Sequence, residues 1–170
     1  LIGETLTKLV LASQRAIGES DYANLVRYQL QHSYRIGKTG ECEELEIVCH
    51  VLTQRGRLDS IFVMQMETTA FEQTKVLSVD GGEFEVRPSA VPGMSALYVV
   101  PPVPLEQADD HDLRIRLRPP PGTRRWNASV SEGQRIRVLI SRLWAPPEIL
   151  DRLRVWAFSN VPIEAPVGAA

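Results

Sequence analysis

Runs in which apolar and polar positions alternate with a period of two recur between residue 26 and residue 160 of this chain. The first such run, 26–35, places Val26, Leu30 and Tyr34 on one side and polar residues between them. Alternation of this kind is typical of β-strands whose two faces meet different surroundings. The clearest later runs are 112–118, 124–130, 134–144 and 152–160. They predict a chain made mainly of strands.

The N-terminal segment follows a different period. Apolar residues recur there at helical spacing, beginning with Ile2, Leu6 and Leu9, and Gly18 follows the last of them. Glycine tolerates the left-handed conformation that commonly ends a helix. The pattern predicts one amphipathic helix at about 3–17.

Turn signals separate the predicted strands. Gly37–Gly40 predicts a turn after the first strand. The run 45–51, the loop 54–57 and the run 62–66 together predict a hairpin. Asp80-Gly81-Gly82 lies between two more runs, 76–79 and 83–88, and an Asp-Gly pair in this setting is a strong hairpin signal. A further strand is predicted at about 95–100.

All twelve prolines lie at residue 88 or beyond, so stiff loops separate the later strands. Many short strands without interleaved helices favour an antiparallel β-sandwich of jelly-roll type, with about eight strands and one N-terminal helix. We expect a single domain over 1–170, made of a helix at 1–18, strands within 19–166 and a tail at 167–170. A helical turn is predicted at about 147–151.

Arginines form the one broad candidate surface. If the late runs are adjacent in one sheet, the arginines opposite their apolar faces merge into one basic face. That face would attract phosphate, nucleic acid, an acidic peptide or an acidic neighbouring subunit. The alternative is an ordinary solvated face whose arginine stems lie over apolar neighbours. The candidate residues are Arg114, Arg116, Arg118, Arg125, Arg135 and Arg137.

Other reactive residues favour structural interpretations. Cys42 and Cys49 are the only cysteines, and their spacing of seven predicts free thiols on opposite faces of one strand. Cys49 and His50 are neighbours on that strand and therefore point apart, which argues against a nucleophile and its base. The acidic cluster 109–112 lacks the alternate ligand spacing of a calcium loop. The sequon 127–129 falls within a predicted strand, and Glu41, Glu43, Glu44 and Glu46 form an acidic run expected to face solvent or an arginine patch on another copy.

Charge and motif content limit the function. Sixteen of the nineteen basic residues are Arg, while the formal net charge is −2, so any nucleic-acid contact must be local. No run approaches the ~18 apolar residues of a membrane span, and we expect no membrane contact. No catalytic, metal-binding or cofactor motif is found. These features predict a non-enzymatic protein without a cofactor.

The two ends of the sequence resemble a known family. The run RIRVLISRLWAPPEILDRLRVWAFSNVPIEAPV resembles the end of picornavirus-like jelly-roll capsid proteins in three places, at 140–147, at 155–161 and at Ala165-Pro166. The N-terminal IGETLTKLVLASQRAI, which has the basic residue Arg15 near its end, is similar to the Gly-Glu-led helix of insect picorna-like capsids. Together these segments cover about a quarter of the chain.

The resemblance implies a mechanical function. We expect a structural subunit of an icosahedral virus capsid that contacts other copies of itself and related capsid subunits. It would lie in the virion, assembled in the host cytoplasm, or otherwise in the cytoplasm. The alternative is a soluble β-sandwich binding module that recognises an anionic ligand or a protein partner through the arginine-rich sheet face.

Overall fold

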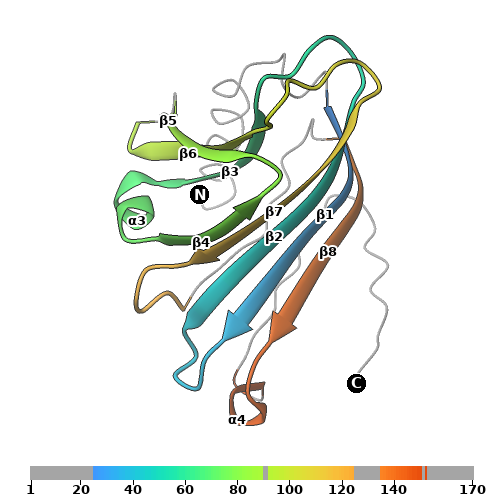
Figure 1. The fold of residues 1–170 in the computed structure, drawn as a ribbon. Helices are drawn as coiled ribbons and strands as arrows, with labels where there is room; N and C mark the ends of the chain where they lie inside the picture. The colour runs from blue at the N-terminus through green and yellow to red at the C-terminus, as the bar shows by residue number, and fades with distance from the viewer. Residues whose placement is uncertain (1–24, 90–91, 125–134, 151, 153–170) are drawn as a thin grey trace, which may run out of the picture.

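A computed structural model describes residues 25–89, 92–124, 135–150 and 152 of this chain. Eight strands and two short helices lie in this part of the sequence (Figure 1). The strands are β1 (Leu25–Ile36), β2 (Cys42–Thr53), β3 (Ile61–Glu67), β4 (Lys75–Asp80), β5 (Glu83–Pro88), β6 (Met94–Val100), β7 (Asp110–Arg118) and β8 (Arg135–Trp144). The helices are α3 (Thr68–Glu72) and α4 (Pro147–Leu150).

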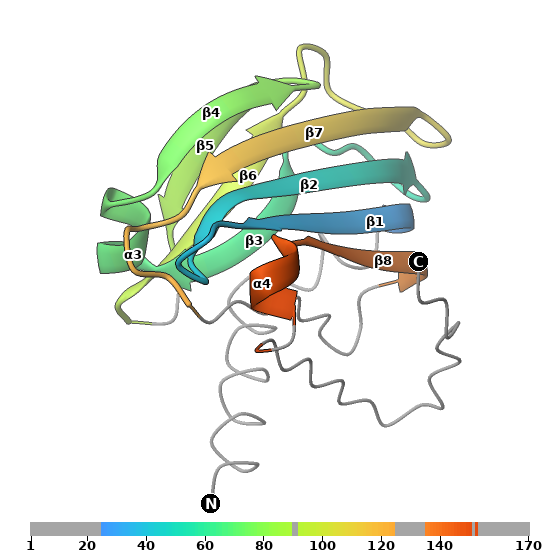
Figure 2. The ribbon, with the colours of Figure 1, turned by 90° about the horizontal axis from the view of Figure 1, so that it is seen from below.

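The strands form two sheets. One has five strands in the order β4-β7-β2-β1-β8, and the other has three in the order β3-β6-β5. Figure 2 shows the smaller sheet on one side of the larger one, toward its β4 and β7 end. The predicted mainly-β fold with eight strands in two sheets is therefore confirmed for the described part of the chain.

One strand pair departs from the expected antiparallel arrangement. β8 runs parallel to β1, with Leu30 beside Leu139 and Tyr34 beside Leu143. All other described ladders are antiparallel. The prediction of an entirely antiparallel sandwich is wrong at this edge, because the chain returns to β1 from a distant part of the sequence and not through a tight turn.

The core lies between the two sheets. Ile47, Val51, Ile115 and Leu117 from the larger sheet are at most 1 % exposed, as are Ile61, Leu97 and Val99 from the smaller one. On β2 and β7 the buried positions alternate, so these strands bury one face, whereas residues 95–99 of β6 are buried on both faces. Burial of such aliphatic side chains contributes roughly 1.5–3 kcal/mol each and is the main stabilising force of the fold.

The first hairpin is as predicted. β1 pairs antiparallel with β2 through the Gly37–Gly40 turn. A bulge interrupts the ladder, since Arg35 lies beside Glu44 but Ile36 lies beside Cys42. The extra residue reverses the alternation. Cys42 therefore faces inward like Cys49, and both are buried free thiols. The prediction that they occupy opposite faces is wrong.

Two other predicted hairpins do not form. β2 is flanked on both edges by β1 and β7, so β3 cannot pair with it and belongs to the other sheet. β4 and β5 also lie in different sheets, so the Asp80-Gly81-Gly82 turn connects the layers instead of closing a hairpin. Gly81 and Gly82 do have the positive φ that the sequence suggested, at 95° and 155°.

The remaining predictions concern short or undescribed segments. The predicted turn at 147–151 corresponds to the four-residue helix α4. The predicted strand at 95–100 corresponds to β6, whereas α3 was not predicted. The helix at 3–17, the sequon and the tail lie outside the described residues, as do the predicted strands at 124–130 and 152–160 except for their first residues. Among the described residues, no helix is long and apolar enough to span a membrane.

Candidate interaction surface on the five-stranded sheet

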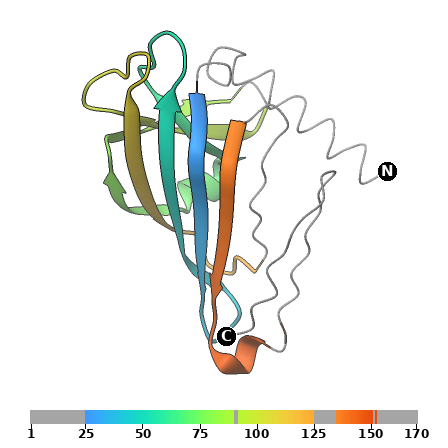
Figure 3. The ribbon, with the colours of Figure 1, turned by 90° about the vertical axis from the view of Figure 1, so that its right-hand side faces the viewer.

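The larger sheet has an outer face, turned away from the smaller sheet. Figures 1 and 3 show the smaller sheet and both helices away from this face, and no described element covers it. On β2 and β7 the outward positions alternate with the core positions. We refer to this side of the five-stranded sheet as the outer face.

Three of the candidate arginines line β7 on the outer face. Leu113, Ile115 and Leu117 are buried, which confirms the predicted division of this strand into two faces. The opposite positions belong to Arg114, Arg116 and Arg118, and the first and last of these are exposed. Lys75 of β4 lies beside Arg118, which extends this basic row by one residue.

An acidic row on β2 lies next to the arginines. The Oε1 of Glu44 lies 2.8 Å from Nη2 and 2.9 Å from Nε of Arg116. The Oε1 of Glu46 lies 3.8 Å from Nε of Arg114. The acidic run was expected to face solvent or another copy, but three of its members pair with arginines of the same molecule. The third is Glu41, whose Oε1 lies 3.9 Å from Nη2 of Arg124. Such pairs lower the positive potential that an anionic ligand would meet.

The remaining candidates do not join this row. Arg135 and Arg137 belong to β8, at the opposite edge from β7, and Arg125 lies outside the described residues. β2 and β1 separate β7 from β8, which amounts to three strand spacings or roughly 14 Å. The condition for one merged basic face, adjacency of the late runs, is therefore not met. Sequence order did not reveal this because sheet order is set by long-range pairing.

The faces of β8 are also reversed relative to the prediction. Val138 and Ile140 were expected to face the core, but they lie beside Gln29 and Gln31 on the outer face. Leu139, 44 % exposed, is on the core side beside Leu30. The alternation within β8 is weak because Val138, Leu139 and Ile140 are all apolar. Only its parallel pairing with β1 fixes the phase.

We expect the acidic row to control binding of anions to the outer face. In Glu44→Gln with Glu46→Gln, the partners of Arg114 and Arg116 lose their charge, so a heparin column should retain the double variant to higher salt. The matched control is Glu67→Gln with Glu83→Gln, two exposed positions of the smaller sheet that remove the same net charge. Co-elution of the two double variants would show that the ion pairs do not mask the arginines.

His50 forms a polar cluster at the end of the outer face. Its Nδ1 lies 2.7 Å from Oδ1 of Asp112 and its Nε2 lies 3.9 Å from Oδ2 of Asp110. Both carboxylates are more than 70 % exposed. No group of three or more His, Cys, Asp or Glu residues suited to a metal occurs in the described part of the chain. These are exposed polar contacts whose contribution to stability is small.

Two connections at one end of the sandwich are joined by backbone hydrogen bonds. Leu58, between β2 and β3, and Leu105, between β6 and β7, exchange two N–H to carbonyl bonds of 2.9 Å. Both leucine side chains are buried. The connections therefore form a fixed end of the fold and not independent loops.

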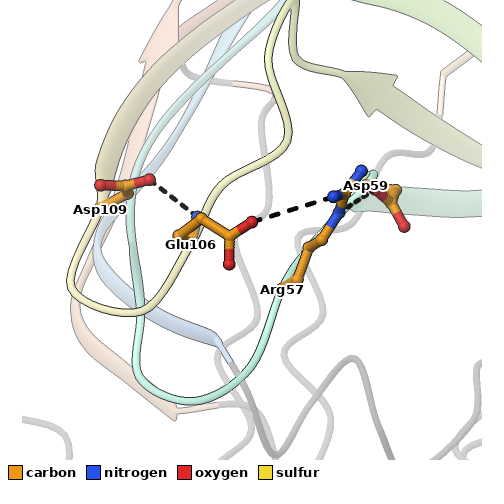
Figure 4. Close-up of polar contacts among 4 residues, drawn as sticks. All are labelled: Arg57, Asp59, Glu106 and Asp109. Carbon is orange, nitrogen blue, oxygen red and sulfur yellow. Dashed lines mark hydrogen bonds and ion pairs between the residues drawn. The ribbon is translucent and has the colours of Figure 1, made fainter.

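Charged side chains surround this junction (Figure 4). Arg57 donates from Nε to Oδ1 of Asp59 at 2.9 Å, and its Nη1 lies 4.0 Å from Oε1 of Glu106. The backbone N–H of Glu106 donates to Oδ2 of Asp109 at 2.7 Å. All these groups are largely exposed, and their contacts organise the turn. Asp109, from the predicted acidic cluster, thus has a structural role.

A second set of polar residues is buried between the sheets. Arg27 is only 5 % exposed, and its Nη2 donates to the carbonyl of Phe62 in β3. The alternation of β1 had placed Arg27 on the polar face, but a bulge at Tyr28 reverses the phase. No sequence signal identified this bulge. The hydrogen bond links the two sheets directly.

Burial also shifts the pKa values of His32, Cys42 and Cys49. Desolvation and the nearby Arg27 charge lower the pKa of His32 to about 4. Its Nδ1 has no hydrogen-bond partner among the described residues. Burial raises the pKa of Cys42 and of Cys49 to about 11, so both remain protonated near neutral pH. Protonated buried thiols are poor nucleophiles.

Comparisons with known proteins do not assign a family. The sequence matches no protein-family model and no curated protein. Similar solved structures include the M1 zinc metallopeptidase from Deinococcus radiodurans, with 17% identity and a TM-score of 0.42 over 58% of this chain and 21% of that one. The E323A mutant of that enzyme, bound to a Tyr-Ser-Ala substrate, is 16% identical with a TM-score of 0.42, over 64% of this chain and 24% of that one.

A putative protease from Parabacteroides distasonis is similar at 12% identity and a TM-score of 0.37, over 59% of this chain and 24% of that one. The alignments thus span about a quarter or less of these solved chains. Likenesses this low support no argument about activity. Function must be inferred from the surface of the chain itself.

Proposed function

We propose that this chain is a structural, non-enzymatic subunit of a capsid-type shell that acts by binding other copies of itself and related subunits. The observation that supports this most is the apolar surface of β8. Trp144 is 63 % exposed, Val138 49 % and Leu139 44 %. An edge strand that exposes large apolar side chains is typical of a site for protein contact.

The chemistry of the described residues supports a role without catalysis. His50 contacts carboxylates, and the Nε2 of His111 contacts the carbonyl of Gly81. In the described ranges, no hydrogen bond joins a histidine to a hydroxyl or thiol that could act as nucleophile. Nucleophilic catalysis requires such a pair. Cys42 and Cys49 are buried and protonated.

The two-layer sandwich supports the capsid proposal only at the level of architecture. A jelly roll is an antiparallel fold, and the parallel β1–β8 pair departs from it. The alternative, an anion-binding module, loses support because Glu44 and Glu46 pair with Arg116 and Arg114 on the same face. Contact with nucleic acid at this face is disfavoured for the same reason.

The experiment that tests the proposal is sedimentation velocity over a range of concentrations. A shell subunit should give a weight-average mass that rises above the 19.0 kDa of one chain as concentration increases. A mass that remains at one chain throughout would contradict it.

A further inference from the structure

We draw no further inference here: the strongest candidate, the exposed patch at the end of β8 where Trp144 lies beside Arg35 and follows Arg142 on the outer face, carries none because nothing in the structure shows what covers it.

Discussion

Acidification is expected to lower the free energy of unfolding by up to about 3 kcal/mol through His32 alone. The ring is buried on the core face of β1, where desolvation and the charge of Arg27 lower its pKa from 6.5 to about 4. In the unfolded chain the same group would titrate near its ordinary value. The folded state therefore resists protonation that the unfolded state accepts.

The direction of the effect follows from proton binding. Between pH 6.5 and pH 4 the unfolded chain binds more protons at this position than the folded chain, so stability falls as pH falls. Above pH 6.5 both states are neutral and the contribution is constant. Below pH 4 both are protonated and the loss is complete. The pH window is therefore about 4 to 6.5.

Urea unfolding of wild type and His32→Gln between pH 7 and pH 4 provides the measurement. Carboxylates also titrate in this range, but they contribute equally to both proteins and cancel in the difference. The wild type should lose up to about 3 kcal/mol more than the variant over this interval. Parallel stability curves would show that His32 is not the group that resists protonation.

Gly82→Ala should destabilise the fold by about 3 kcal/mol. Gly82 has φ of 155°, and a Cβ atom there would lie 2.2 Å from the carbonyl oxygen of Val100. The neighbouring atom is backbone of β6, so the clash cannot be relieved by a rotamer change. This glycine lies where the chain passes from the larger sheet to the smaller one.

Gly40→Ala is the control that measures the cost of placing alanine at positive φ without a steric clash. Gly40 also has positive φ, 81°, but no atom lies within 4 Å of a Cβ built there. Thermal or urea unfolding should show a loss of about 1 kcal/mol for Gly40→Ala and a clearly larger loss for Gly82→Ala. Equal losses would show that the close approach to Val100 is not important.

Sequence alternation predicted the strands whose two faces differ strongly. On β7, arginines alternate with Leu113, Ile115 and Leu117, and the structure has the same faces. On β2, Leu45, Ile47, Cys49 and Val51 face the core as their spacing indicated. Period-two patterning is reliable here because only one phase buries the apolar set.

The wrong predictions concern which strands pair and which sheet face a side chain occupies, because both depend on contacts between residues far apart in the sequence. Nothing in the sequence near Asp80 shows that β4 and β5 join different sheets. The bulges at Tyr28 and Glu43 reversed the positions of Arg27 and Cys42, and β8 has too little alternation to fix its own phase. The candidate arginines do not form one basic face for the same reason. β8 follows β7 along the described chain, but β2 and β1 lie between them in the sheet.

The central claim is that this chain functions through contacts with its own copies. Sedimentation velocity of the purified chain, from low to high micromolar concentration at two salt concentrations, tests it most directly. We expect a weight-average mass that rises above 19.0 kDa with concentration, and we expect this rise to persist at high salt because the exposed side chains Val138, Leu139 and Trp144 of β8 are apolar. A single species of 19.0 kDa under all these conditions would contradict it.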